Sequence, residues 1–301
     1  MVPCDDDVQH LSGDASAPRL VIMPGTSDTT AAVSAAADEA LPEEQARLLG
    51  ASPRNAWRVT ARGVRLDRVP RPSRLVTVAA RPADLVLDLV RTAVIVIDMQ
   101  NDFCHPDGWL ASIGVDVQAA RRPIASLVEG LPALRAAGVA VVWVNWGTRP
   151  DHANLPPNVL HVYDPEARGM GIGSLQPTGH PVLERGSWGA AVVDELVAAP
   201  EDLWVHKHRM SGFWDTDLDS VLRNLDVTTL LFAGVNADQC VLATLIDGAC
   251  IGYDVVMCED ASATTSPSFC WDATVYNVRQ CFGFTTTLGA VAGAATSAAA
   301  V

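Results

Sequence analysis

The sequence predicts an α/β fold in which a parallel β-sheet carries helices on both faces. Short runs of apolar and β-branched residues recur along the chain, and such runs are typical of strands buried on both faces. Helical stretches alternate with these runs, and two of them end at a glycine. Strands that alternate with helices at this spacing form parallel βαβ units.

The strands and helices can be assigned in order along the chain. We expect five buried strands, at Ala93–Ile97, Val139–Asn145, Leu203–His206, Thr229–Ala233 and Tyr253–Cys258. We expect helices between them, at about Val117–Ala137, from Thr216 or Asp217 to Asn224, at Cys240–Ile251 and at Ser268–Cys281. Gly138 and Gly252 end the first and third of these helices.

The two ends of the chain differ from this central region, which spans residues 73–286. Residues 1–72 are rich in acidic residues, alanine, arginine and proline, and their periodicity is weak. We expect a partly irregular N-terminal extension with a short strand at Leu20–Met23 and some helix near Pro42–Leu49. Residues 287–301 are rich in alanine and glycine, and we expect them to form a loose tail.

Charge and cysteine content exclude several function classes. The formal net charge of -14 over 301 residues disfavours nucleic acid and an anionic membrane surface as partners. No apolar run approaches the length of a membrane-spanning helix, and the N-terminus carries Asp5, Asp6 and Asp7 instead of the basic start of a secretory signal. The 7 cysteines contain no C-x-x-C pair, which suits neither a disulfide framework nor a zinc ribbon. We therefore expect a cytoplasmic protein.

Three chemically active side chains follow predicted strands. Asp98 follows the first strand, Lys207 follows the third, and a turn beginning at Gly234 leads from the fourth to Cys240. Ligands of open parallel sheets bind at the carboxyl ends of the strands, so a carboxylate, an ammonium and a thiol are expected at one edge. Lys207 is the only lysine among the 21 basic residues. Its presence either reflects chance or marks a position that needs a compact ammonium.

Each of the three residues also has a structural interpretation. Cys240 at a helix start would favour a thiolate, but it could equally be a small residue that packs the helix. Asp98 could take the thiol proton and pass it to a leaving amine, or it could cap backbone amides of the next loop. Lys207 could pair with Asp98 and stabilise the thiolate, or it could be a surface charge. The three together favour the catalytic interpretation.

Three motifs carry a family resemblance. They are Asp98-Met99-Gln100-Asn101-Asp102-Phe103, Lys207 with Ser211-Gly212-Phe213, and Gly234-Val235-x-x-x-x-Cys240-Val241. In this order they resemble the isochorismatase-like cysteine hydrolases, over about residues 75–284. Segments near Gly186-Ser187-Trp188 and Arg209 to Thr216 look most like the ureidoacrylate-type and biuret-type amidohydrolases of that family.

The resemblance implies a fold and a site. The fold would be a three-layer α/β/α sandwich with a six-stranded parallel sheet, and 73–286 would be the hydrolase domain. Asp98, Lys207 and Cys240 would be the catalytic triad. A cis peptide bond at Val235–Asn236 would shape the turn, and the amides of Asn236 or Ala237 and of Cys240 would hold an oxyanion. The family usually forms homodimers or homotetramers.

Further residues are candidates for substrate binding. Asn101 and Gln280 could hydrogen-bond a urea group, Trp146 and Trp214 could wall a planar substrate, and Arg209 or Arg279 could hold a carboxylate. Phe213 belongs to the second motif and is a candidate with them. No metal or other cofactor is expected, because thiol chemistry needs none and the segment Asn145 to His152 lacks the Asp-x-His of nicotinamidases. The pair Asp151-His152 fits a solvated loop.

The predicted function is cysteine-dependent hydrolysis of a C–N bond in a small ureido or carbamoyl compound, through a thioester. An amidase acting on N-carbamoyl amino acids or on nicotinamide-like amides is an alternative within the family. Hydrolysis of a vinyl ether, as in isochorismate, needs no thiol, so Cys240 disfavours it. A non-catalytic scaffold is a third possibility, supported by the N-terminal extension and the Asn236-Ala237 turn, but a complete triad argues against it.

Overall fold

The fold is described from a computed structural model that places residues 46–50, 55–68 and 71–299. Its centre is a six-stranded sheet, in which every neighbouring pair of strands is parallel, with the order β11-β10-β9-β6-β7-β8. The strands are β6 (Thr92–Ile97), β7 (Ala140–Trp146), β8 (Leu203–Lys207), β9 (Thr229–Gly234), β10 (Asp254–Ser262) and β11 (Phe284–Thr286). The predicted α/β class and six parallel strands are confirmed.

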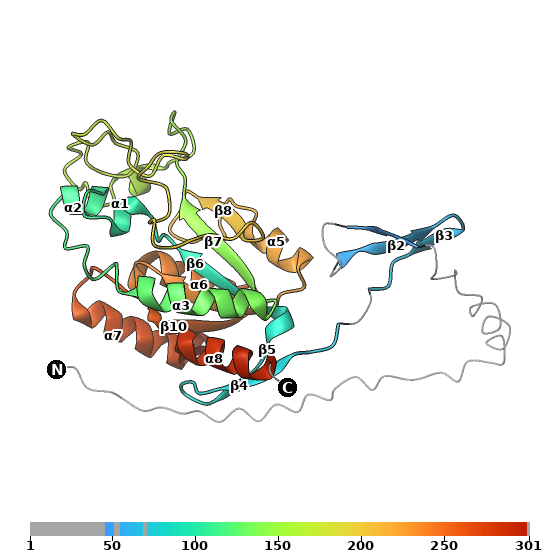
Figure 1. The fold of residues 1–301 in the computed structure, drawn as a ribbon. Helices are drawn as coiled ribbons and strands as arrows, with labels where there is room; N and C mark the ends of the chain where they lie inside the picture. The colour runs from blue at the N-terminus through green and yellow to red at the C-terminus, as the bar shows by residue number, and fades with distance from the viewer. Residues whose placement is uncertain (1–45, 51–54, 69–70, 300–301) are drawn as a thin grey trace, which may run out of the picture.

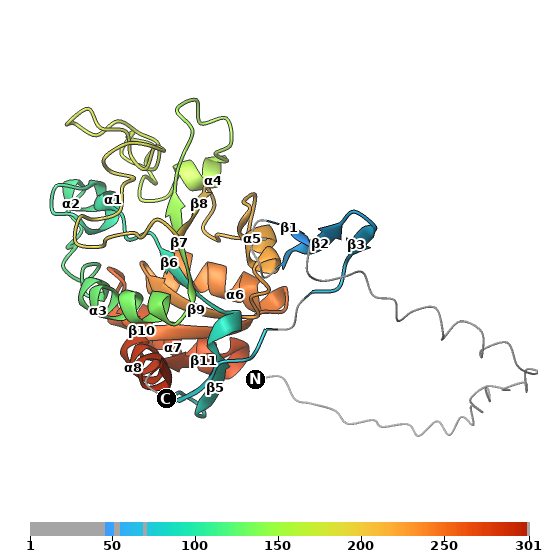
Figure 2. The same cartoon turned by 45° about the vertical axis from the view of Figure 1, so that its right-hand side comes forward.

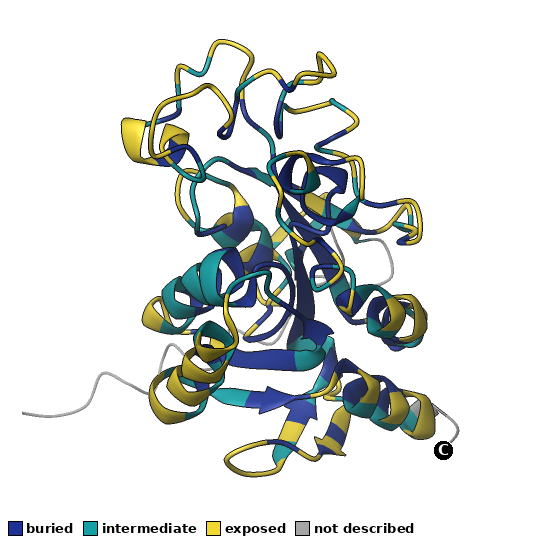
Figure 3. Cartoon of the chain, turned by 90° about the vertical axis from the view of Figure 1, so that its left-hand side faces the viewer, coloured by how far each residue is buried: buried dark blue, intermediate teal, exposed yellow. Residues whose placement is uncertain are grey.

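Helices cover both faces of the sheet (Figures 1 and 2). Helices α3 (Pro123–Ala136) and α8 (Leu288–Ala299) lie on one face, and α5 (Leu218–Asn224), α6 (Leu242–Cys250) and α7 (Ser268–Asn277) lie on the other. Short helices α1 (Asn101–Cys104), α2 (Trp109–Ser112) and α4 (Pro157–Leu160) lie in the loops above the carboxyl ends of the strands. Every side chain of β6 and β9 is buried, as Figure 3 shows for the strands between the helix layers.

The C-terminal segment is a packed helix, and the expectation of a loose tail is wrong. Helix α8 buries Leu288, Val291 and Ala295 against α3 and the hairpin of β4 (Leu75–Val78) and β5 (Leu85–Asp88). A Cβ at Gly130 of α3 would lie 2.9 Å from Leu288, so this glycine lets the two helices approach closely. Alanine is also the best helix former, so an alanine-rich segment becomes a stable helix once one face is buried.

The described part of the N-terminal extension forms strands, and the expected helix near Pro42–Leu49 is wrong at its described end. Strands β1 (Arg47–Leu49), β2 (Trp57–Thr60) and β3 (Gly63–Arg65) form an antiparallel sheet. Local periodicity cannot reveal such a strand, because its partner lies about ten residues further on. The expected strand at Leu20–Met23 and residues 42–45 lie outside the described residues.

The long segment between β7 and β8, residues 147–202, lies over the carboxyl edge of the sheet (Figure 1). The division of the chain at residues 72 and 286 stays a prediction. No helix among the placed residues has the length and apolar character needed to cross a lipid bilayer.

Candidate active site

The structure brings Asp98, Lys207 and Cys240 together at the carboxyl edge of the sheet. Asp98 directly follows β6, Lys207 is the last residue of β8, and Cys240 lies in the π-helical turn η4 (Ala237–Val241) after β9. The Lys207 Nζ atom lies 3.0 Å from Asp98 Oδ2 and 3.2 Å from Cys240 Sγ. All three side chains are buried, so the ammonium links a carboxylate and a thiol away from bulk water.

Lys207 is held in place by three further features of its surroundings. Its ammonium donates to the Arg209 carbonyl at 3.2 Å and lies 4.0 Å from the centre of the Trp146 ring. A cation above an indole ring is stabilised by the ring's negative face. Lys207 and Asp98 are both buried, so water does not compete for their hydrogen bonds. The functional interpretation of the single lysine therefore agrees with where the structure places it.

Asp98 sits in a tight backbone turn that aims its carboxylate along the edge of the sheet. Its backbone has a φ of 54°, in the left-handed region that non-glycine residues rarely adopt. Its amide donates to the Val144 carbonyl at 3.1 Å, and its Oδ1 accepts from the Trp146 amide at 3.2 Å. Neighbouring β7 thus orients the carboxylate, and Lys207, which contacts both groups, links it to the Cys240 thiol.

The turn before Cys240 depends on close backbone packing. Gly234 has a φ of 112°, and a Cβ there would lie 2.0 Å from the Ile97 carbonyl, so only glycine fits where β9 meets β6. The next peptide bond, Val235–Asn236, is cis, as the family resemblance implied. The Ala237 amide already donates to the Ala263 carbonyl at 2.8 Å, so Ala237 is not available to hold an oxyanion. Asn236 and Cys240 remain as the candidate donors.

The protonation of the two acidic groups is controlled by burial. Burial raises the pKa of the Cys240 thiol to about 12, with the Lys207 charge opposing the shift and the Asp98 charge adding to it. Burial also raises the pKa of the Asp98 carboxyl above its ordinary value, and Lys207 again opposes the shift. Burial thus acts against the thiolate that the helix start was expected to favour, and the resting charge of Cys240 stays a prediction.

The alkylation rate of Cys240 should report this raised pKa. Only the thiolate reacts with iodoacetamide, and its fraction rises about tenfold per pH unit below the pKa of the thiol. We expect the rate of Cys240 alkylation, followed by peptide mass spectrometry, to keep rising from neutral pH to about pH 10. The urea-unfolded chain serves as the control, because its cysteines titrate near about pH 8.5. A plateau near neutral pH in the folded protein would contradict a neutral resting thiol.

Several residues predicted to bind substrate have other roles. Asn101 is buried and donates to the Trp188 carbonyl at 2.9 Å, and Trp146 lies buried beside Lys207. Arg209 is 2.9 Å from Asp215 and donates to the Asn154 carbonyl at 2.7 Å. These contacts are to other parts of the protein, and the prediction that the three side chains also contact substrate stays a prediction.

Four candidates remain. Arg279 forms an ion pair with Glu259 at 2.6 Å. Phe213 stacks on Tyr253, at the far end of α6 from the thiol. Trp214 is exposed. Gln280 is exposed in the turn η5 (Val278–Phe282), which precedes β11 and so lies at the opposite edge of the sheet. Sequence order alone could not show this, because side chains following a motif can point into any layer of the fold.

The motif that begins at Asp98 also anchors the segment between β7 and β8, which lies above the site. Gln100 donates hydrogen bonds from Nε2 to the carbonyls of Trp146 and Ala190, and its Oε1 accepts one from the Trp146 amide. Asp102 is buried and accepts from the amides of Trp109 and Leu183. A Cβ at Gly189 would lie 2.3 Å from the Asp102 carboxylate, so the chain passes directly against it. Within this motif, Asp98 pairs with Lys207 of the triad, whereas Gln100 and Asp102 fix the covering loop.

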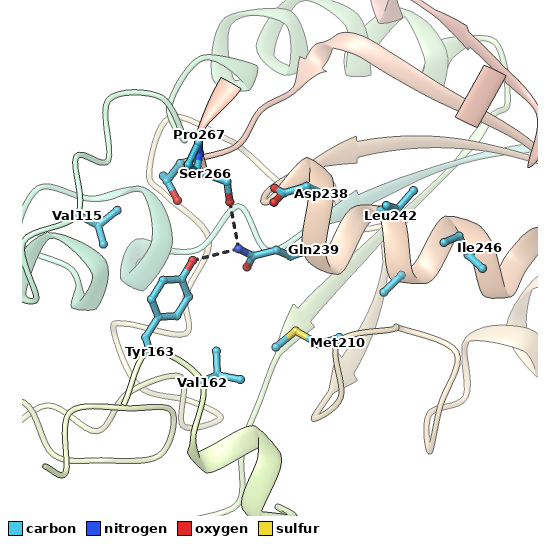
Figure 4. Close-up of a pocket in the computed structure, with 12 residues that line it drawn as sticks. Val115, Val162, Tyr163, Met210, Asp238, Gln239, Leu242, Ile246, Ser266 and Pro267 are labelled. Atoms are coloured by element: carbon cyan, nitrogen blue, oxygen red, sulfur yellow. Dashed lines mark hydrogen bonds between the residues drawn. The ribbon is translucent and has the colours of Figure 1, made fainter. Parts of the chain in front are cut away.

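A cavity of about 740 Å³ is lined by Gln239, the residue before Cys240, and by other residues that the sequence analysis did not single out (Figure 4). Met210 lines it, with its sulfur 3.8 Å from Cys240 Sγ. Gln239 reaches across it and donates to the Tyr163 hydroxyl at 3.2 Å and the Ser266 hydroxyl at 3.3 Å. Asp238 and Gln239 stand next to Cys240 in the sequence, which is the one local signal that could have identified them.

Asp151 and His152 lie in a loop above the sheet. Asp151 is exposed and forms an ion pair with Arg149 at 2.6 Å, which fits the expected solvated loop.

Comparison with known proteins identifies the family. The isochorismatase domain model matches residues 92–290. The chain is 36% identical to ureidoacrylate amidohydrolase RutB of Agrobacterium fabrum over 236 residues, which are 75% of this chain and 99% of that relative. RutB of Rhizobium rhizogenes is also 36% identical, over 72% of this chain and 88% of the relative.

Solved structures have the same fold. A cysteine hydrolase from Pseudomonas syringae pv. phaseolicola matches with a TM-score of 0.60 and 28% identity, over 76% of this chain and 100% of that one. N-carbamoylsarcosine amidase from Thermoplasma acidophilum matches in fold with a TM-score of 0.51 and 24% identity, over 66% of this chain and 96% of that one. The family predicted from the three motifs is confirmed, and the chain belongs to the isochorismatase family of hydrolases.

Proposed function

We propose that this protein hydrolyses a C–N bond of a small ureido or carbamoyl compound through a covalent intermediate on Cys240. That the chain is an amidohydrolase follows from its family and from its curated relatives. The observation that carries the finer proposal is the position of Lys207 Nζ, 3.0 Å from Asp98 and 3.2 Å from Cys240. The RutB relatives, whose name denotes a ureido substrate, support the substrate class.

In the first half of the reaction, Asp98 acts as the base. It takes the thiol proton while the sulfur of Cys240 bonds to the substrate carbonyl carbon. The carbonyl oxygen becomes an oxyanion, for which the amides of Asn236 and Cys240 are the proposed donors. Asp98 then passes its proton to the nitrogen, the C–N bond breaks, and ammonia or an amine leaves. The product on Cys240 is a thioester where the substrate is an amide, and a thiocarbamate where the substrate is a urea.

In the second half, water completes the hydrolysis. Asp98, again a carboxylate, takes a proton from water while the water oxygen bonds to the thioester carbon. The C–S bond then breaks, and the proton on Asp98 returns to the sulfur of Cys240. Lys207 contacts both Asp98 and Cys240, so its ammonium can stabilise both the carboxylate and the transient thiolate.

Ammonia release from a panel of ureas and carbamoyl compounds tests this proposal. Active compounds should release ammonia or amine, and rapid acid quenching should give a Cys240 peptide with the mass of the acyl adduct. Turnover with no adduct on Cys240, or no turnover of any ureido, carbamoyl or simple amide compound, would overturn the proposal. The homodimer or homotetramer expected from the family stays a prediction.

A further inference from the structure

The cavity lined by Met210 and Gln239 has mainly apolar walls. Val162, Met210, Leu242, Ile246 and Pro267 are among them, and Figure 4 shows them around an open space. The Met210 sulfur, which lines this space, lies 3.8 Å from Cys240 Sγ, so a group attached to the reacting carbonyl would reach the cavity by passing Met210. Apolar walls of this kind favour an apolar occupant.

The charged group in this lining is an acid. Among the described residues, no lysine or arginine lines the cavity, whereas Asp238 does. Asp238 lies two residues before the nucleophile, and one of its oxygens accepts from the Thr264 hydroxyl. Nearby cations have other partners, because Lys207 contacts Asp98 and Cys240, and Arg209 contacts Asp215. Arg122 lines a second cavity, which shares Thr265 and Ser266 with this one, but it is not in the lining of the first.

The polar groups inside the cavity are largely satisfied by one another. The Gln239 amide donates to the hydroxyls of Tyr163 and Ser266, and its oxygen lies 3.5 Å from the Asn236 amide nitrogen. These groups are neutral, and none supplies the positive charge that a carboxylate needs when it leaves water. A carboxylate in this cavity would lose hydration and would also lie near the Asp238 carboxylate, which repels it.

We propose that the substrate carries an uncharged, apolar substituent, unlike ureidoacrylate, whose name denotes a carboxylate. This inference rests on the proposed function, since it names the substrate class of the same site. It separates this chain from its RutB relatives in substrate while keeping the chemistry of the family. Asp238 is then a specificity residue that excludes anionic ureas.

Three ureas with the same arrangement of heavy atoms test the inference. Isopentylurea ends in an isopropyl group, ureidopropionate in a carboxylate, and (dimethylaminoethyl)urea in a protonated amine. Binding is measured by protection of Cys240 from iodoacetamide at mildly alkaline pH, which needs no turnover, and kcat/KM is measured by ammonia release. We expect isopentylurea to bind better and to react faster than ureidopropionate by about tenfold or more.

Two variants test whether the Asp238 carboxylate causes the preference for the uncharged urea over the anionic one. Asp238→Asn removes a negative charge with little change of shape, and we expect it to reduce the preference for isopentylurea over ureidopropionate severalfold. Asp254→Asn removes the same charge from an exposed position at the start of β10, at the opposite edge of the sheet, and should leave the preference unchanged.

The outcomes separate this inference from the proposed function. Equal or better binding of ureidopropionate, or best binding of the cationic urea, would overturn the inference. An unchanged preference in Asp238→Asn would overturn the role of that residue. Protection by isopentylurea without turnover of any urea would leave the inference intact and count against the proposed urea hydrolysis.

Discussion

Replacing Cys240 by alanine is expected to lower kcat on the best amide or urea substrate by about four orders of magnitude or more. The variant lacks the atom that forms the covalent intermediate, and no other described cysteine lies within reach of Lys207 and Asp98. Steady-state ammonia release, with enzyme concentration high enough to detect residual activity, provides the measurement. The acyl adduct seen by mass spectrometry should also disappear.

A matched control separates chemistry from folding. Cys250 lies exposed at the end of α6, the helix that follows η4, so Cys250→Ala removes a thiol group without touching the site. It should retain normal kcat and thermal stability. Binding of the best urea to Cys240→Ala, measured by calorimetry, should stay within about tenfold of the unmodified protein, because the cavity walls are unchanged. Full turnover by Cys240→Ala would refute covalent catalysis at this residue.

The sheet could be predicted because its signal is local. Thr92–Ile97 and Thr229–Gly234 are continuous buried runs, and glycines mark the ends of α3 and α6. The sixth strand, Phe284–Thr286, is only 3 residues long, too short to stand out by periodicity, and only the family resemblance implied it. Helix α8 and strand β1 were missed because their stability comes from distant partners, Gly130 for the helix and β2 for the strand.

The triad could be located for a different reason. In a parallel sheet all carboxyl ends lie at one edge, so residues at the ends of β6, β8 and β9 share that edge however far apart they are in sequence. The substrate cavity follows no such rule. Tyr163 comes from the long segment between β7 and β8, and Ser266 comes from the loop after β10. Their meeting at Gln239 depends on loop paths, which residue patterns do not determine.

Replacing Asp98 by asparagine is expected to lower kcat by about a hundredfold to ten-thousandfold, because the base that moves the proton is lost. It also leaves Lys207 buried without its carboxylate, which should cost about 3–5 kcal/mol of unfolding free energy. Urea denaturation measures that loss of stability. A decrease in both activity and stability would also follow from simple damage to the fold, so a third measurement is needed.

The rate of Cys240 alkylation supplies that measurement, because in Asp98→Asn it should rise while the turnover rate falls. The Asp98 charge raises the pKa of the Cys240 thiol and the Lys207 charge lowers it. Asp98→Asn should therefore lower that pKa and increase the rate of alkylation by iodoacetamide at neutral pH, while ammonia release collapses. Lys207→Met should raise the pKa and slow alkylation. If Asp98→Asn slowed alkylation together with turnover, the carboxylate would be a structural cap, and the role of base would belong to another group.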